Sequence, residues 1–166
     1  AYGALVVEDY ARWTAGQVML ETAERLTSQE HEPATQQYLV LVGALRTLAT
    51  GEHAPELVLD AFLLRSLAIA GWAPSFDACT RCGLEGPHPY FHVPSGGALC
   101  PDCRVPGSVS PAPEVLGLLS ALLTGDWSTA VASAPRHRRD ASGIVAAHLQ
   151  WNLERGLRSL PLVQRG

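Results

Sequence analysis

The chain has 166 residues, of which 47% are hydrophobic and 17% are charged, with a formal net charge of −4. This composition is typical of one folded domain with an apolar core, and it excludes a disordered or very highly charged chain. The longest apolar stretches are interrupted by Asp60, Arg65 and Gly71, so we expect no membrane-spanning helix and no membrane partner. The first ten residues lack the basic start and the long apolar run of a signal peptide, which favours a cytoplasmic protein.

Charge is distributed unevenly along the chain. Residues 1–60 contain three Arg against nine acidic residues, whereas residues 136–166 contain six Arg against two acidic residues. The overall acidity argues against a general nucleic-acid coat, but the last part of the chain is locally basic. All twelve basic residues are Arg. A GC-rich genome produces this bias without a functional reason, although Arg also stacks on bases and binds phosphate or carboxylate better than Lys.

Three helices are predicted before the cysteines. The first extends from about residue 9 to residue 28, and its inward side chains are Ala15, Val18, Met19, Thr22, Ala23 and Leu26. The second begins at Pro33 and stops at Gly51, with an inward face of Tyr38, Leu41, Val42, Leu45, Leu48 and Ala49. The third, which Pro55 opens, is apolar on nearly every side. Such a helix belongs at the centre of a bundle, so we expect residues 57–70 to be the most buried segment.

Residues 76–107 differ from their surroundings, because they are rich in Gly and Pro and contain all four cysteines. Cys79 and Cys82 form one C-x2-C pair, and Cys100 and Cys103 form a second pair after seventeen intervening residues. Between the pairs, residues 90–93 are typical of a short strand and residues 94–97 of a turn. The order of knuckle, hairpin and knuckle predicts a zinc ribbon, in which four thiolates hold one structural Zn²⁺.

Other uses of the cysteines are open at this point. They could pair as disulfides in an oxidising compartment, although no secretory signal supports this. A redox C-x2-C motif would need a βαβ context, which this region lacks. His88 and His92 lie between the two pairs and could replace one cysteine ligand, although surface or hairpin positions fit them better.

Two shorter helices are expected after the ribbon. Pro111 or Pro113 begins the first, and Gly125 ends it. Its inward side chains are Val115, Leu118, Leu119 and Leu122. Asp126 can cap a short Ala-rich helix, which Pro135 terminates.

The last helix is predicted from about residue 142 to residue 160, with Pro161 as its stop. Its core-facing side chains are Val145, Leu149, Leu153, Leu157 and Leu160. The opposite side is expected to carry His148, Trp151, Arg155 and Arg158, where the ring could stack on a base while guanidinium groups bind phosphates or an acidic peptide. Alternatively, Trp151 packs against the ribbon or a neighbouring helix and the arginines are only solvated.

A second basic cluster, Arg136-His137-Arg138-Arg139, precedes this helix in a segment predicted to be a loop. These side chains could contact phosphate groups without reading a sequence, or they could belong to a solvated, mobile loop. The predicted fold is therefore mainly α. It is a helical bundle made of residues 1–75 and 108–166, with a four-cysteine zinc ribbon and its short β-hairpin inserted at residues 76–107.

Several segments also carry a family resemblance. They are VLDAFLLRSLAIAGWAP (58–74), CTRCG (79–83), FHVPSGGALCPDC (91–103), GDW (125–127), LETAERL (20–26) and AAHLQWNLERGLRSLPLV (146–163). In this order they resemble bacterial RecO, a family of recombination mediators in DNA repair, and are most similar to its actinobacterial form with four zinc cysteines. Members of that family begin with an oligonucleotide-binding β-barrel, and nothing before Asp9 alternates like such a barrel. The chain therefore resembles the C-terminal helical and zinc portion alone.

The resemblance implies a non-enzymatic protein of the cytoplasm and nucleoid that binds single-stranded DNA, anneals strands, contacts RecR and supports recombinase loading. It also implies docking of the C-terminal tail of the single-stranded DNA-binding protein, which is acidic and ends in an apolar residue with a free carboxylate. Such a ligand needs an apolar pocket rimmed by guanidinium groups. The last helix offers Trp151, Arg155 and Arg158, with Arg138 and Arg139 near its start, whereas Arg65 offers a second site beside the central helix.

Two functions of other classes remain as alternatives. One is a zinc-ribbon module that binds another protein and has no affinity for DNA. The other is a zinc hydrolase or deaminase, which the residues do not favour. A deaminase needs an H-x-E element and a Pro directly before its cysteine pair, whereas Leu99 precedes Cys100. An H-E-x-x-H metalloprotease motif also fails after His31.

Overall fold

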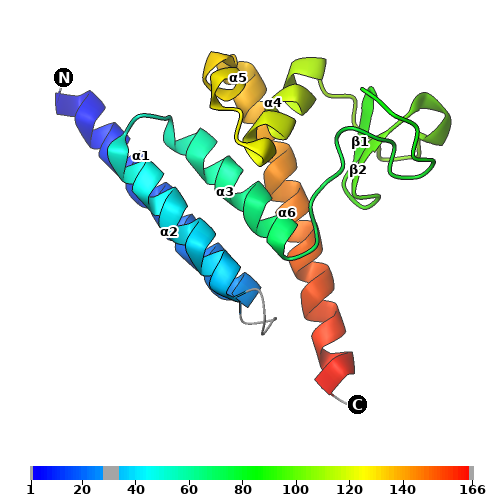
Figure 1. The fold of residues 1–166 in the computed structure, drawn as a ribbon, viewed down its shortest axis with the longest axis horizontal. Coiled ribbons are helices and arrows are strands. Elements are labelled where there is room, and N and C mark those ends of the chain that lie inside the picture. Colours follow the sequence, from blue (N-terminus) through cyan, green and yellow to red (C-terminus); the bar gives the residue numbers. More distant parts are fainter. Residues whose placement is uncertain (1, 28–33, 165–166) are drawn as a thin grey trace.

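The computed structural model describes the backbone of residues 2–27 and 34–164, and the side chains of residues 10–27 and 34–155. Its elements are α1 (Tyr2–Thr27), α2 (Ala34–Thr50), α3 (Pro55–Ile69), β1 (Tyr90–His92), β2 (Gly97–Leu99), the 3₁₀ turn η1 (Pro101–Cys103), α4 (Pro113–Thr124), α5 (Trp127–Ala132) and α6 (Pro135–Gln164). Figure 1 shows a helical body with the β1–β2 ribbon on the side opposite α1 and α2. The mainly helical fold with an inserted ribbon is confirmed.

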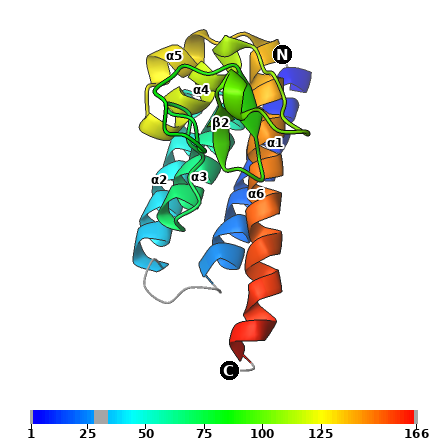
Figure 2. The same ribbon diagram turned by 90° about the vertical axis from the view of Figure 1, so that its right-hand side faces the viewer.

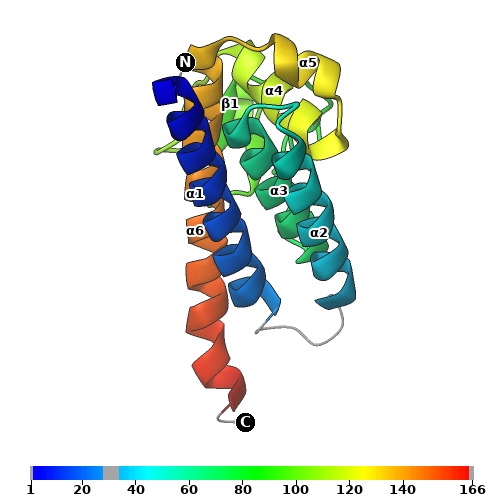
Figure 3. The same cartoon turned by 90° about the vertical axis from the view of Figure 1, so that its left-hand side faces the viewer.

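Helix α3 lies at the centre of the body, as a sequence that is apolar on nearly every side predicts. It contacts α1, α2, α4 and α6. Nine of its fifteen residues are buried, including Phe62, Leu64 and Leu67 at 2% exposure or less. Because a helix that is apolar all round must be covered on every side, these four neighbours are what the sequence of α3 requires. Helices α1 and α2 run side by side on the face away from the ribbon (Figure 3).

The predicted inward face of α1 is correct. Ala15, Met19, Thr22, Ala23 and Leu26 are buried and Val18 is half-buried. The helix begins at Tyr2, seven residues earlier than expected, since no Pro interrupts the chain there. Ser28, the predicted end, lies outside the described residues.

The predicted inward face of α2 is wrong in part. Tyr38 is 63% exposed and Ala49 is exposed as well, whereas Gln37 and Leu48 are buried. The amide Nε2 of Gln37 donates to the carbonyl oxygen of Ser66 on α3 at 2.9 Å. A polar side chain thus occupies the contact position, because its hydrogen bond offsets the cost of burial. The buried stripe of α2 is therefore rotated by one residue from the predicted one.

Helices α4 and α5 follow their sequence signals closely. Pro113 opens α4, all four predicted core residues are buried, and Gly125 ends the helix with a left-handed φ of 85°. The carboxylate of Asp126 caps α5 by accepting from the backbone N–H of Thr129 at 3.3 Å. Prolines at a first helical turn and glycines just after a last turn are the expected boundaries.

The predicted start and end of the last helix are both wrong. Helix α6 begins at Pro135 and continues to Gln164, so Arg136–Arg139 form its first turn and not a loop. Proline is well suited to the first helical position, where its missing N–H is not needed. At Pro161 only one hydrogen bond is lost near the helix end, and the helix continues for three more residues. Figure 2 shows its last turns extending beyond the other helices.

The ribbon is joined to the helical body through a tight backbone contact. Strands β1 and β2 pair antiparallel, with Phe91 opposite Ala98. At Gly97 a Cβ atom would lie 2.3 Å from the carbonyl oxygen of Ser75, so that only glycine fits beside the segment arriving from α3. The rings of Phe76 and Phe91 stack at 6.0 Å between centroids and belong to the main core. The ribbon is thus packed on the body rather than hanging from a linker.

Candidate functional site

The four cysteines converge at one end of the ribbon. In the first knuckle, the backbone N–H of Gly83 donates to the carbonyl oxygen of Cys79 at 2.9 Å. In the second, η1 turns the chain and the N–H of Cys103 donates to the carbonyl oxygen of Cys100 at 3.1 Å. These turns aim the thiols at a common point, where their sulfur atoms all lie within 4.8 Å of one another.

The geometry fits a tetrahedral metal and not a pair of disulfides. All four cysteines are free, and the Sγ atoms of Cys82 and Cys100 are 3.8 Å apart. A disulfide would bring two sulfurs to about 2.05 Å. Four sulfurs at about 2.3 Å from a central zinc would lie about 3.8 Å from each other, as observed for this pair. The cluster can therefore hold a metal ion with four thiolates, and it leaves no coordination position for water or substrate.

The thiols of the cluster ionise unequally in the absence of a cation. Burial opposes ionisation of Cys79, but backbone N–H groups of both knuckles lower the pKa of its thiol to about 5. Hydrogen bonding to Cys100, together with burial, raises the pKa of Cys103 to about 12. Neighbouring thiolates cannot all form without a positive charge between them, and a divalent metal supplies that charge.

The two histidines between the cysteine pairs have other partners. The Nε2 atom of His88 lies 2.6 Å from the carbonyl oxygen of Leu84, and His88 is 8% exposed. The Nδ1 atom of His92 lies 2.6 Å from the hydroxyl of Ser95 within the hairpin turn. Among the described residues, the metal cluster contains cysteines only. Neither histidine replaces a cysteine ligand.

The predicted exposed face of the last helix is wrong at His148. This side chain is 2% exposed, and its Nε2 lies 2.7 Å from the carbonyl oxygen of Trp72. Burial lowers the pKa of His148, although the carbonyl of Trp72 partly opposes this shift. The buried residues of α6 are Ala141, Val145, His148, Asn152 and Leu153, because the helix is covered by α3, by α4 and by the segment leading to the ribbon.

The other residues of that face are separated. Trp151 is half-buried and its indole N–H is buried without a hydrogen-bond partner. Arg155 is exposed, whereas the side chain of Arg158 lies outside the described residues. The side chains of the predicted core residues Leu157 and Leu160 are also outside the described part. The structure therefore does not bring His148, Trp151 and Arg155 together at the surface.

Arg138 acts within the fold. Its Nε donates to Ser133 Oγ at 2.9 Å, its Nη2 donates to the carbonyl oxygen of Val131 at 2.9 Å, and its Nη1 lies 3.7 Å from Glu56. The guanidinium thus ties α5 and α6 to α3. By contrast, Arg136 and Arg139 are exposed at the start of α6. Along a helix that turns 100° per residue, Arg139 and Arg155 point about 160° apart, so the two basic clusters do not form one strip.

A groove beside α3 contains Arg65. This Arg65 groove, of about 350 Å³, is lined by Leu39, Val40, Gly43, Ala44, Thr47, Val58, Ala61, Phe62, Arg65 and Trp127. The ring of Trp127 stacks on His53 at 4.2 Å, which holds α5 against the loop before α3. Arg65 is half-buried, and no ion pair to it is found among the described residues. An apolar groove with one uncompensated guanidinium is suited to an apolar ligand that bears a carboxylate.

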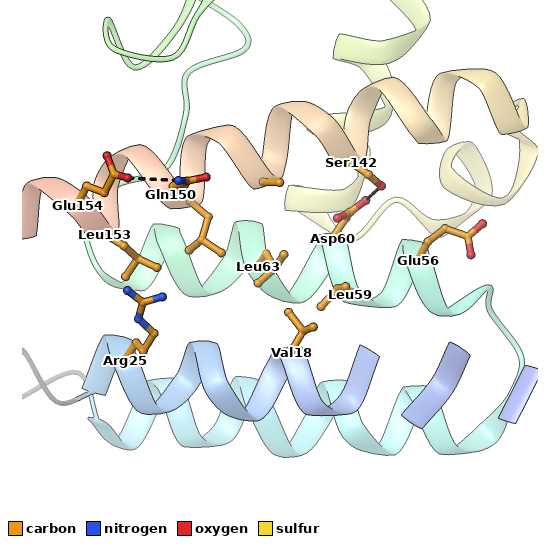
Figure 4. A pocket seen from close by; sticks show the side chains of 12 residues that line it. Val18, Arg25, Glu56, Leu59, Asp60, Leu63, Ser142, Gln150, Leu153 and Glu154 are labelled. Atoms are coloured by element: carbon orange, nitrogen blue, oxygen red, sulfur yellow. Dashed lines mark hydrogen bonds between the residues drawn. The ribbon is translucent and has the colours of Figure 1, made fainter. Parts of the chain in front are cut away.

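A second groove lies between α1 and α6 with α3 as its floor (Figure 4). This Asp60 groove, of about 540 Å³, is lined by Val18, Arg25, Glu56, Leu59, Asp60, Leu63, Ser142, Ala146, Leu149, Gln150, Leu153 and Glu154. The hydroxyl of Ser142 donates to Oδ2 of Asp60 in a short hydrogen bond. Burial raises the pKa of the Asp60 carboxyl to about 6, the bond from Ser142 opposes the rise, and Glu56 adds to it. Sequence reasoning missed this groove, because it depends on how far α1 and α6 diverge.

The fold and the cysteine cluster define a helical binding domain with an inserted four-cysteine ribbon. Residues 7–161 match the family model described as recombination protein O C terminal. The chain is 66% identical to the DNA repair protein RecO of Streptomyces coelicolor and 64% identical to that of Streptomyces griseus, each over 164 residues. It is 58% identical to RecO of Thermobifida fusca over 165 residues. The chain belongs to the RecO C-terminal family, whose members are non-enzymatic mediator proteins.

The extent of these matches limits what they show. Each covers 99% of this chain, but only 66% of the two Streptomyces proteins and 68% of the Thermobifida protein. No solved structure matches the chain. In the part of the chain that the structure describes, no helix is both long and apolar enough to cross a membrane.

Proposed function

We propose that this chain is the helical and zinc portion of a recombination mediator that acts in DNA repair in the cytoplasm, at the nucleoid. In this role it binds single-stranded DNA and the tail of the single-stranded DNA-binding protein, and it works with RecR in strand annealing and recombinase loading. Membership of the RecO family supports this proposal. The ribbon of residues 76–107 is its inserted unit, between bundle segments 1–75 and 108–166.

The metal of the ribbon is one structural Zn²⁺, held by Cys79, Cys82, Cys100 and Cys103. The observation that supports zinc is the sulfur separation of 3.8 Å, together with free thiols at all four positions. Zinc binds four thiolates without redox chemistry and so supplies folding energy only. The ribbon presents the second knuckle and its hairpin as a rigid unit on the helical body.

The Arg65 groove is the site that best fits the acidic tail. Its apolar lining accepts the terminal apolar side chain, and the guanidinium of Arg65 binds the free carboxylate. Among the described residues, no carboxylate competes for Arg65. The alternative site on the last helix loses support, because His148 and the indole N–H of Trp151 are buried.

A titration of the tail peptide tests this assignment. Arg65→Ala should weaken binding by about 1.5–3 kcal/mol, the usual contribution of a hydrogen bond to a charged group. Arg155→Ala should leave the affinity unchanged, and it serves as the matched control on an exposed helix surface. Equal loss in both variants, or loss in Arg155→Ala alone, would return the tail site to the last helix.

Single-stranded DNA is expected to contact Arg136 and Arg139, since both are exposed in the first turn of α6. Phosphate contacts there depend on charge, so the affinity should fall steeply as salt is raised. The double variant Arg136→Ala/Arg139→Ala should weaken binding of a labelled oligonucleotide and lower its salt dependence. Arg46 is an exposed arginine on α2, and Arg46→Ala should change neither the binding nor its salt dependence.

The second candidate is a zinc-ribbon module that binds protein but not DNA. It is favoured by the net charge of −4 and by Arg138, whose guanidinium is already used within the fold. This candidate would be selected if the unmutated chain bound the tail peptide but caused no mobility shift of the oligonucleotide at low salt.

A further inference from the structure

The Asp60 groove is as long as a short helix. Its floor and walls are apolar, formed by Leu59 and Leu63 of α3 and by Leu149 and Leu153 of α6. Ser142 marks one end and Glu154 the other, twelve positions further along α6. At 1.5 Å per residue the groove is about 18 Å long, which equals about three helical turns.

The polar groups at the two ends of the groove differ (Figure 4). At one end Asp60 is 5% exposed, and its carboxylate accepts a hydrogen bond from the hydroxyl of Ser142. Glu56, at the same end, already has Arg138 at 3.7 Å. At the other end, Gln150 donates to Glu154 at 3.2 Å and Arg25 of α1 points toward Leu153.

Asp60 is the group that lacks a counter-charge. No cation lies within ion-pair distance of its carboxyl among the residues with described side chains. A buried carboxylate without such a partner is costly, and its raised pKa expresses that cost. A cationic side chain entering the groove would be attracted to this carboxyl, in a setting where water screens the attraction only weakly.

We propose that the Asp60 groove docks an amphipathic helix of a partner protein, whose apolar face covers Leu59, Leu63 and Leu149 and whose Lys or Arg pairs with Asp60. Leu59 and Leu63 are four residues apart on one side of α3, and Leu149 of α6 lines the same groove, so a docked helix with apolar side chains at i, i+3/i+4 and i+7 could contact all three. Three carboxylates, of Glu56, Asp60 and Glu154, line the groove against one guanidinium, that of Arg25, and this balance disfavours an acidic tail or a phosphate backbone there. The groove therefore has the opposite charge preference to the Arg65 groove.

A pair of designed peptides tests the proposal. One is an amphipathic helix of about 15 residues, long enough for the groove, with leucines on one face and lysines flanking them. The other carries glutamate at each lysine position. The lysine peptide should bind the chain saturably and the glutamate peptide should not. Absence of lysine-peptide binding at millimolar concentration, or equal binding of the two peptides, overturns the proposal.

Two adjacent alanines of α6 provide the matched variants. Ala146 lines the groove, whereas Ala147 is also exposed but does not line it. Ala146→Trp should fill the groove and weaken the lysine peptide at least about tenfold, while Ala147→Trp should have no effect. Asp60→Asn should also weaken it, provided that its circular dichroism is unchanged. Equal affinity of the two tryptophan variants would contradict the site.

Two further measurements separate the other outcomes. The acidic tail peptide should bind Ala146→Trp as well as it binds the unmutated chain, so that failure of either groove is seen independently. Sedimentation should give the same oligomeric state for the unmutated chain and for Ala146→Trp. If the unmutated chain self-associates and Ala146→Trp abolishes this association, the occupant is a second copy of this chain and the proposal of a partner helix is wrong.

Discussion

The imidazole Nε2 of His148 on α6 lies 2.7 Å from the carbonyl oxygen of Trp72, in the segment that leads from α3 to the ribbon. A neutral imidazole donates one N–H to this carbonyl and is compatible with its burial. Protonation would place a charge in a site that is 2% exposed. Burial therefore favours the neutral imidazole in the contact that joins α6 to the base of the ribbon.

This contact predicts a loss of stability in mild acid. The folded pKa of His148 lies below its unfolded value, so its contribution is fully present above pH of about 6.5 and is lost as the pH falls. His148→Gln keeps an N–H donor and cannot titrate. Urea melts should show that the unfolding free energy of the unmutated chain falls more than that of His148→Gln as the pH is lowered from about 7.5 to about 5. A constant difference would contradict the burial of a neutral imidazole.

Asp60 should show the opposite dependence. Its folded pKa of about 6 exceeds the ordinary value of 3.8, so its contribution is fully present below pH 3.8 and is lost as the pH rises through 6. Asp60→Asn should therefore be stabilised relative to the unmutated chain at neutral pH, by at most about 3 kcal/mol, and not in strong acid. Thermal melts of Asp60→Asn and of the unmutated chain, at neutral pH and in strong acid, check this. Lower stability of the variant at neutral pH would show that Asp60 already has a counter-charge.

Removal of one cysteine should unfold the ribbon while the helical body persists. Cys79, Leu99 and Cys100 form a small core of their own, separate from the main one. Cys82→Ser should abolish binding of zinc, measured by elemental analysis as one ion per unmutated chain. Hydrogen exchange should increase in residues 76–107 and stay low in α3. Exchange that rises equally in α3 would mean that the body depends on the metal.

Leu64→Asp should destabilise the chain severely, by about 4 kcal/mol or more, because an unpaired charge would lie among packed side chains. Leu64 is 1% exposed at the centre of α3. Leu39→Asp on α2 is the matched control, since that leucine is 63% exposed. Chemical denaturation of the two variants should separate them clearly. A small effect at Leu64 would be incompatible with a central α3.

The sequence predicted those features that local signals specify. The apolar run of α3 and the spacing of Cys79 to Cys103 each carry their structural meaning within a short segment. The buried Gln37 could not be predicted in the same way, because its partner is the carbonyl of Ser66, 29 residues away. A buried polar side chain can be predicted only when its hydrogen-bond partner is known.

The errors in α6 have a related cause. Pro135 was expected only to end α5, yet the same residue opens the next helix. The side of α6 that contains His148 is covered by the approach to the ribbon, which helical periodicity alone does not place. The two grooves depend on the relative positions of three helices each, and no short segment encodes them.

The position of α6 also determines when the body can close during synthesis. Asp60 and Trp72 receive their partners from residues 82 and 76 positions later in the chain. The whole ribbon is therefore synthesised before α6 can cover α3. Until α6 has been synthesised, the apolar side of α3 that packs against it stays exposed. A ribbon that binds its metal early would bring the start of the following segment close to α3. It would thereby reduce the loop-closure entropy that opposes the packing of α6 on α3.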